Sequence, residues 1–288
     1  MIKTKKLGLA LGGGGAKGLA HIGVIKELER AGVPIDFIAG TSMGAIIGGW
    51  YAATKDIEHI ENIFLKLKFR DIFPFREFIR HKEGSLAGGE RMKALLDGHM
   101  KDLKIENCKI PFAAVATDVK NGEAVVIKKG NLAEAARASS ALPVIFRAVP
   151  LGGKLLMDGG FSDPIPVDVA REMGADFVLA VDVSSKWLKE DGNGSEDVKS
   201  VYSAISNSMA LVEYQLARPI IKNADLVLRP PVLNFNLLGF GDSGQIISLG
   251  EEEARLYMEE IRKGAGIREP RKTTGEKFID FLFNSDKN

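Results

Sequence analysis

Residues 36–52 of this 288-residue chain read DFIAGTSMGAIIGGWYA. The five residues Gly40-Thr41-Ser42-Met43-Gly44 have the G-x-S-x-G spacing of a nucleophilic serine on a sharp turn between a strand and a helix. Residues 37–39 before this turn are apolar and predict a short buried strand. Residues 43–53 are apolar on nearly every face and predict a buried helix. The stretch therefore predicts a strand–turn–helix unit that presents Ser42.

A second unit of the same kind precedes this stretch. The apolar residues 7–11 predict a strand, four glycines follow at 12–15, and residues 17–31 have the apolar spacing of a helix that Gly32 ends. Two such units in succession indicate parallel strands. We therefore expect a layered α/β/α fold around a mostly parallel central sheet.

The rest of the chain continues this alternation. The region 55–110 is predicted to be a mainly helical insert. Later strands are predicted at 112–117, 124–128, 144–149, 155–157, 177–183 and, as an edge strand, 225–228. Later helices are predicted at 131–139, 167–173, 198–222, with Pro219 bending its end, and 248–263, and a polar loop at 189–197. No repeat and no linker between two cores is visible, which favours one domain.

Composition excludes several classes of function. The 39 basic and 38 acidic residues give a net charge of +1, so nucleic acid is not expected as a partner. The single Cys108 cannot form an internal disulfide, which fits a reducing compartment. The apolar run 7–11 is too short for a secretory signal, and no run of 18 apolar residues predicts a membrane-spanning helix. We therefore expect a cytoplasmic protein.

The glycine loop, residues 12–18, is open to three functional interpretations. Gly13, Gly15 and Gly18 match the dinucleotide pattern G-x-G-x-x-G, although no acidic residue ends the second strand. A phosphate loop would need Ser or Thr after Lys17, where this chain has glycine. In the third interpretation, backbone N–H groups at a helix start form an oxyanion hole, reinforced by Lys17. A tight turn also accounts for the loop alone.

The base that would activate Ser42 is not obvious, because no acid-then-histidine pair follows the serine. His21 lies one turn inside the helix after the glycine loop, where a structural histidine is the commoner case. The other histidines, at 59, 81 and 99, fall in the helical insert, where surface roles are the default.

A carboxylate is the alternative base. Asp158 follows the predicted strand 155–157, and Gly159-Gly160 behind it let the chain turn away and leave the carboxylate in a cleft. An aspartate has a pKa of ~3.9 in water, and an apolar cleft would raise that pKa and make it a better base. The competing aspartates are Asp118, Asp163, Asp176 and Asp182.

Three motifs, taken in order, resemble those of the patatin-like phospholipases: the glycine loop, the serine turn and Asp158-Gly159-Gly160. The segments Ala116-Thr117-Asp118 and Ala138-Ser139-Ser140-Ala141-Leu142-Pro143 also resemble interior blocks of that family. The chain is similar to small bacterial members related to the catalytic domain of neuropathy target esterase. The resemblance covers residues 5–230 as the patatin-like domain. Residues 231–288 are expected to form a C-terminal helical extension packed on it.

The resemblance implies a Ser–Asp dyad in which Ser42 is the nucleophile and Asp158 its base. It implies oxyanion donors at Gly13, Gly14 and Gly15, with the Met43 N–H as a further donor, and no metal or organic cofactor. Residues that support these motifs are Lys17, Gly18, Gly40, Gly44, Gly159 and Gly160.

The implied activity is hydrolysis of a carboxylic ester in a phospholipid, a lysophospholipid or a related lipid. Two alternatives remain open on the residues. The same dyad would serve a transacylase that passes the acyl group to an alcohol. The glycine loop would serve a nucleotide-binding regulator.

Two further segments bear on partners. Residues 66–82 interleave Lys and Arg with Phe and Ile, which suits peripheral contact with an anionic membrane, although inward-facing phenylalanines in a helical subdomain are the alternative. The apolar residues 232–240 are expected to line an acyl-chain pocket or to form a partner surface. The apolar tail at 277–283 suggests a terminal helix. The sequence does not predict the oligomeric state.

Overall fold

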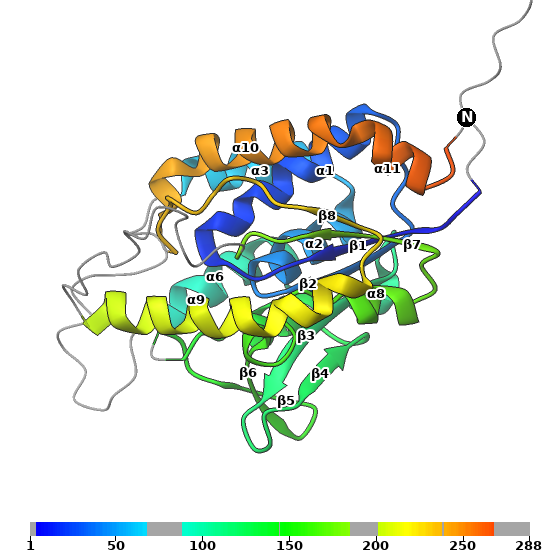
Figure 1. Ribbon diagram of the computed structural model, residues 1–288. Helices are drawn as coiled ribbons and strands as arrows, with labels where there is room; N and C mark the ends of the chain where they lie inside the picture. Colours follow the sequence, from blue (N-terminus) through cyan, green and yellow to red (C-terminus); the bar gives the residue numbers. More distant parts are fainter. Residues whose placement is uncertain (1–3, 68–87, 144, 185–200, 238, 268–288) are drawn as a thin grey trace, which may run out of the picture.

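The computed structural model of the protein describes residues 4–67, 88–143, 145–184, 201–237 and 239–267 (Figure 1). The strands in this part are β1 Leu7–Leu11, β2 Phe37–Thr41, β3 Phe112–Asp118, β4 Ala124–Ile127, β5 Val149–Leu151, β6 Lys154–Asp158, β7 Phe177–Val181 and β8 Leu226–Leu228. The α-helices are α1 Ala20–Arg30, α2 Met43–Thr54, α3 Ile57–Lys66, α6 Gly88–Met100, α7 Leu132–Ser139, α8 Val167–Glu172, α9 Val201–Ile220, α10 Ser243–Leu256 and α11 Met258–Gly264.

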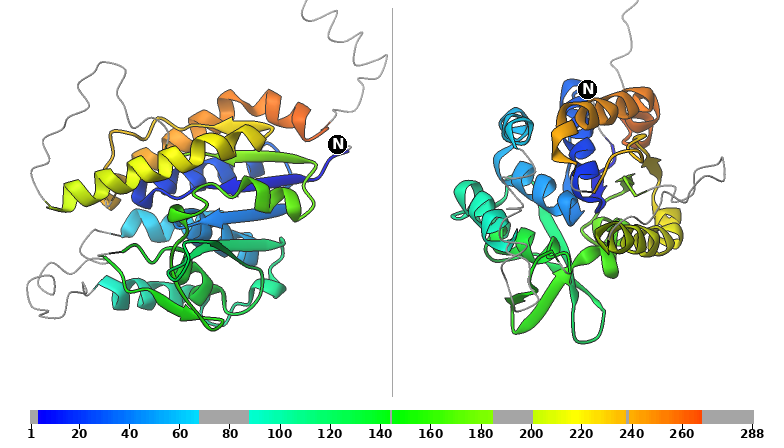
Figure 2. Two further views of the ribbon diagram at one scale, coloured as in Figure 1. Left: turned by 60° about the horizontal axis from the view of Figure 1, so that its bottom comes forward. Right: turned by 90° about the vertical axis from the view of Figure 1, so that its left-hand side faces the viewer.

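These strands form one mixed sheet in the order β5-β6-β3-β2-β1-β7-β8, with β4 paired to β3. The five strands from β3 to β8 run parallel, whereas β4, β5 and β6 pair antiparallel. Helices cover both faces of the sheet (Figure 2), so the predicted layered α/β/α fold is confirmed.

The two faces of the sheet are packed with side chains of different size. In β1, Leu7, Leu9 and Leu11 point into a large core under α1, α2 and α10, while Gly8 and Ala10 face α8 and α9. Alternation of this kind follows from the two-residue period of a strand. The small side chains on the second face let α8 come close, since a Cβ at Gly8 would lie 2.6 Å from the Cβ of Ala175 just beyond that helix.

Some predicted elements differ from the structure. The strand expected over 144–149 overlaps β5 only at Val149. The N–H groups of Ile145 and Phe146 both donate to the Leu142 carbonyl, so these residues form a turn. Residue 144 lies outside the described part. The helix expected over 248–263 is two helices, α10 and α11, which meet at the non-helical backbone of Tyr257. The segments predicted at 189–197 and 277–283 lie outside the described residues.

One edge of β3 is shared by two strands. β2 pairs along it as far as Val115, opposite Thr41, and β6 takes over at Ala116, opposite Asp158. The other edge of β3 is occupied by β4, which pairs with residues 114–117. The end of β2 and the end of β6 therefore meet at one point on β3.

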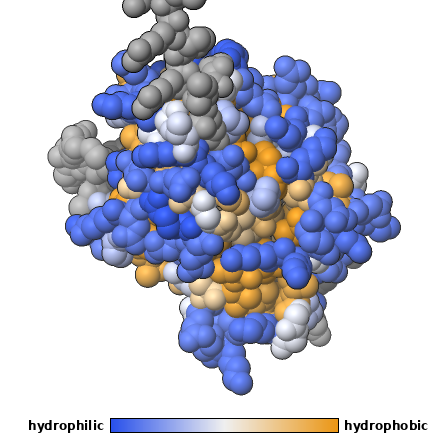
Figure 3. All heavy atoms as spheres, turned by 90° about the vertical axis from the view of Figure 1, so that its right-hand side faces the viewer, coloured by the Kyte–Doolittle hydropathy of each residue, from blue (hydrophilic) through white to orange (hydrophobic). Residues whose placement is uncertain are grey.

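The parallel strands all end on one side of the molecule, at the left of Figure 1. The opposite side, where β1 enters, shows hydrophobic atoms in its centre and hydrophilic atoms around them (Figure 3). Ligand sites in open α/β sheets lie at the carboxyl ends of the strands. None of the helices in the described ranges is long and apolar enough to cross a membrane.

The C-terminal helix α10 lies against α1 at very short range. A Cβ at Gly23 of α1 would clash with the Ile247 carbonyl, and a Cβ at Gly250 of α10 would clash with the Ala20 carbonyl. Both contacts involve backbone atoms, which cannot rotate out of the way. The two glycines therefore set the distance between these helices.

We propose that residues 231–264 unfold together with the rest of the domain, and Gly250→Ala tests this. The added methyl group pushes α10 away from α1, so we expect about 1–3 kcal/mol lower free energy of unfolding, in one cooperative urea transition. The control is Gly244→Ala in the same helix, where the new Cβ would lie 3.6 Å from Leu65 and make an ordinary contact. Equal stability of the two variants would contradict the proposal.

Candidate active site

Ser42 lies on the sharp turn between β2 and α2, as its motif predicts. Its φ of 54° and ψ of −120° belong to a region that residues other than glycine rarely adopt. A Cβ at Gly40 would clash with the Gly44 carbonyl, and a Cβ at Gly44 would clash with the Leu11 carbonyl. The glycines of the motif are therefore required by the close packing of the turn against β1.

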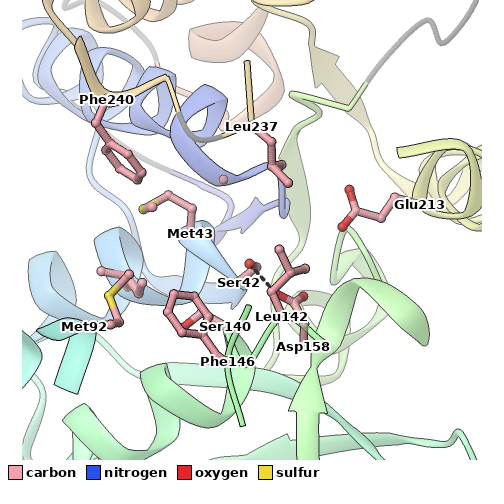
Figure 4. A pocket seen from close by; sticks show the side chains of 13 residues that line it. Ser42, Met43, Met92, Ser140, Leu142, Phe146, Asp158, Glu213, Leu237 and Phe240 are labelled. Atoms are coloured by element: carbon pink, nitrogen blue, oxygen red, sulfur yellow. Dashed lines mark hydrogen bonds between the residues drawn. The ribbon is translucent and has the colours of Figure 1, made fainter. Parts of the chain in front are cut away.

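The Ser42 hydroxyl donates a hydrogen bond to Asp158 Oδ2 at 2.7 Å (Figure 4). The other carboxylate oxygen accepts a hydrogen bond of 2.9 Å from the Gly160 N–H. Asp158 is only 1% exposed, and burial raises its pKa to about 6. The carboxylate is therefore ionised at neutral pH, yet it is a stronger base than an aspartate in water.

The backbone of Ser42 is anchored by Ser139 at the end of α7. The Ser42 N–H donates to Ser139 Oγ at 2.9 Å, and Ser139 Oγ donates in turn to the Val115 carbonyl of β3. The sequence pointed to Ser139 only as part of an interior block. Its role here is to fix the turn to the sheet, so the Ser42 N–H is not available to a ligand.

The glycine loop supplies backbone N–H groups next to Ser42. Gly14 has a φ of 149° and Gly15 a φ of 57°, and both line the same pocket as Ser42 and Met43. No acceptor for the N–H groups of Gly14, Gly15 and Met43 is found among the described residues. Gly13 was expected to be an oxyanion donor, but its N–H donates to the Pro164 carbonyl at 3.0 Å. Three of the four predicted donors therefore remain free.

The other motif residues act through packing. A Cβ at Gly18 would lie 2.7 Å from the Cβ of Met43, so this glycine lets the loop approach the start of α2. A Cβ at Gly159 would clash with the Val115 carbonyl. Because glycine has no Cβ, the chain can turn away directly after Asp158.

His21 is a structural residue rather than a partner of Ser42. It is fully buried, and its Nε2 donates to the Gly12 carbonyl at 2.8 Å. Burial lowers the pKa of His21 to about 4, so the ring is neutral. His59 and His99 lie near the surface beside Trp50, and His81 lies outside the described residues.

The four competing aspartates have other partners. Asp118 pairs with Lys154 at 3.1 Å, and Asp176 accepts from the Lys6 N–H. Asp182 accepts from Ser184, and the Asp163 carboxylate accepts from the backbone of Ile165. The hydrogen-bond partner of the Ser42 hydroxyl is Asp158.

Glu213 of α9 is a pocket residue that the sequence analysis missed. It is 8% exposed and lines the pocket together with Ser42 and Asp158. The missed signal is its spacing, because Met209, Glu213 and Ala217 recur every four residues and form the buried stripe of α9. Lys17, the predicted reinforcement of an anion site, interacts electrostatically with this glutamate, and burial lowers the pKa of Lys17.

Most of the remaining pocket wall is apolar (Figure 4). Leu237 and Phe240 of the segment 232–240 line the pocket, and residue 238 lies outside the described part. That this pocket holds an acyl chain stays a prediction. The apolar lining residues are Met43, Ile46, Met92, Leu142, Phe146, Leu237 and Phe240. Among the described residues, no group of three or more His, Cys, Asp or Glu could hold a metal ion.

Comparisons with known proteins agree with these features. The family model of patatin-like phospholipases matches residues 9–171. Lysophospholipase nte1 of Emericella nidulans is 29% identical over 295 residues, which cover 95% of this chain and 19% of that protein. Patatin-like phospholipase domain-containing protein 6 of Homo sapiens is 32% identical over 269 residues, which cover 85% of this chain and 20% of that protein. The chain therefore spans about one fifth of the length of these curated relatives.

The fold also has a counterpart among solved structures. The crystal structure of VipD from Legionella pneumophila aligns with a TM-score of 0.55 at 13% identity, covering 91% of this chain and 67% of that one. This likeness concerns the fold.

Because the backbone of Ser42 is strained, we expect glycine at this position to give a more stable protein than alanine, the reverse of the usual order. Both Ser42→Ala and Ser42→Gly remove the hydrogen bond to Asp158, but only glycine relieves the strain of about 1–3 kcal/mol. We expect Ser42→Gly to unfold at a higher urea concentration than Ser42→Ala. In an unstrained helix or strand, glycine would be the less stable by about 0.5–1 kcal/mol, and that order here would contradict the strain.

Proposed function

Because the chain belongs to the patatin-like phospholipase family, we propose that it is a serine acyl hydrolase acting on the carboxylic esters of lipids. The observation that carries the proposal is the 2.7 Å hydrogen bond from Ser42 Oγ to Asp158. Beside it lie three backbone N–H groups that have no acceptor in the described part of the chain. A hydroxyl next to a base and oxyanion donors is the arrangement that acyl transfer needs.

The proposed reaction has two acyl-transfer steps. As Ser42 Oγ attacks the ester carbonyl, its proton passes to Asp158 Oδ2, and the N–H groups of Gly14, Gly15 and Met43 bind the tetrahedral oxyanion. Collapse breaks the ester bond, and Asp158 returns the proton to the leaving alcohol. Water then attacks the acyl-enzyme with Asp158 again as base, which releases the fatty acid and restores Ser42. The first turn of α2 adds its positive end to the site.

The apolar wall of the pocket suits the acyl chain of a lipid. The cavity has a volume of about 40 Å³, which is room for water molecules rather than for a chain. A bound acyl chain must therefore displace side chains, and the flexible Met43 and Met92 are the ones best suited to move. The relatives named lysophospholipase support a phospholipid or lysophospholipid as the substrate.

Hydrolysis is proposed in preference to the alternatives. A transacylase would use the same residues, and no observation favours an alcohol over water as the acceptor. A nucleotide-binding regulator would use the glycine loop, but Gly14 and Gly15 line the pocket that contains Ser42.

Ser42→Ala and Asp158→Asn each test the dyad. We expect both to lower kcat/KM for lipid esters by at least about 10³-fold, because one removes the nucleophile and the other the base. Both should also prevent labelling by a fluorophosphonate probe. Asp163→Asn is the matched control, since this half-buried aspartate is not bonded to the Ser42 hydroxyl, and it should retain activity. A folded Asp158→Asn protein with full activity would refute the dyad.

We also propose that residues 66–82 make peripheral contact with anionic membranes, on the basis of their interleaved basic and aromatic side chains. The protein should sediment with vesicles rich in phosphatidylserine and not with phosphatidylcholine vesicles. Each basic residue near such a surface contributes about 1 kcal/mol, so replacing Lys66, Lys68 and Arg70 together by Glu should weaken binding by at least about 100-fold. The contact would be refuted if vesicle binding were the same for both lipid compositions and were unchanged by the triple substitution.

A further inference from the structure

The Glu213 carboxyl group lies close to the dyad because Gly160 and Gly13, which face it, have no side chains. A Cβ on Gly160, whose N–H bonds to Asp158, would lie 2.5 Å from Glu213 Oε1. A Cβ on Gly13 would lie 3.8 Å from the same oxygen. No described residue forms a hydrogen bond with the Glu213 carboxyl group. A polar group in this position faces the pocket and is available to whatever the pocket binds.

The aromatic side chains of the pocket and the Glu213 carboxyl group lie on opposite sides of Ser42. In Figure 4, Met92, Phe146 and Phe240 lie on one side of Ser42. Glu213 lies on the other side, together with Leu142 and Leu237, with its carboxyl group directed toward the dyad. An ester bound at Ser42 has an acyl chain on one side of its carbonyl and an alcohol on the other. The aromatic side fits the acyl chain, which leaves the alcohol portion facing Glu213.

The charges around Glu213 decide its protonation state. Burial and the negative charges of Asp158 and Asp182 raise its pKa to about 8, against the opposing effect of Lys17. Asp158, with a pKa of about 6, ionises first. Between these two values Asp158 is a carboxylate and Glu213 is a neutral acid. A neutral acid can donate a hydrogen bond, which an ionised carboxylate cannot.

We propose that Glu213 is a specificity-determining residue that donates a hydrogen bond from its carboxyl O–H to an oxygen on the alcohol portion of the substrate. The substrate class is a monoacyl lipid whose glycerol carries a free hydroxyl close to the ester. This inference rests on the proposed hydrolase function and adds which part of the substrate is recognised. A site that bonds a substrate hydroxyl discriminates against esters that lack it, because its own polar group is then left unpaired.

The experiment compares two esters of one acyl chain, monooctanoylglycerol and para-nitrophenyl octanoate, with wild type, Glu213→Gln and Glu213→Met. Loss of one hydrogen bond corresponds to about tenfold in kcat/KM. We therefore expect Glu213→Met to lower the ratio of kcat/KM for the glycerol ester to that for the aryl ester by about tenfold. Glu213→Gln, whose amide still donates, should keep most of the ratio. Gln215→Met, on the exposed side of the same helix, is the matched control.

The pH profile on the glycerol ester provides a readout that a structural role would not move. Activity in wild type should rise through pH 6 as Asp158 ionises and fall through pH 8 as Glu213 loses the proton it donates. A glutamine at position 213 cannot ionise. The Glu213→Gln variant should therefore keep the rise in activity through pH 6 and lose the decrease through pH 8.

An unchanged ester ratio in Glu213→Met, or a fall through pH 8 that persists in Glu213→Gln, would overturn the role of Glu213 while leaving the hydrolase intact. A wild-type protein inactive on both esters would overturn the proposed function, and this inference with it.

Discussion

The contact between Ser42 and Asp158 depends on the way that one edge of β3 changes its partner. β2 ends beside Val115, and β6 begins its pairing at the next residue, Ala116. Residues 116 positions apart in the chain are thereby brought within hydrogen-bond distance by backbone pairing alone. The sheet is itself held by the layers on its two faces, so the precision of the site comes from the core. Gly40, Gly44 and Gly159 serve this arrangement because a Cβ at each of them would clash with a backbone carbonyl.

Burial of Asp158 supplies a better base at a cost in stability. The increase in its pKa from 3.8 to about 6 corresponds to about 3 kcal/mol of native-state free energy once the group is ionised in both states. Because the folded pKa is the higher one, this cost is absent below the unfolded value and grows as pH rises toward 6. The strained backbone of Ser42 adds a second unfavourable contribution at the same place. Both features belong to the turn region, where packing against β1 and Ser139 holds them.

Much of this structure could be predicted from local sequence patterns. The alternation of apolar strands and helices predicted the layered fold, and residue spacing singled out Ser42. Asp158 was one of five candidate aspartates until the family resemblance selected it. The features that were missed depend on distant contacts. The N–H of Gly13 is occupied by the Pro164 carbonyl, which no local pattern indicates. Glu213 resembles an ordinary glutamate of a solvated helix until α9 is placed against Gly160. The strand expected at 144–149 was wrong for Ile145 and Phe146, because an apolar run also fits a turn that closes on the Leu142 carbonyl.

The pocket is built from two stretches of chain, one inside the residues that the family model matches and one beyond them. The match to the family ends at residue 171 and contains the serine turn, the glycine loop and Asp158. Glu213, Leu237 and Phe240, which form the outer wall, all come from the chain beyond it. The groups proposed to break the bond thus lie within the matched residues, whereas Glu213, which is proposed to recognise the alcohol portion, lies beyond them. Substitutions at Glu213, Leu237 or Phe240 would therefore reshape the outer wall and leave the residues of the reaction centre unchanged.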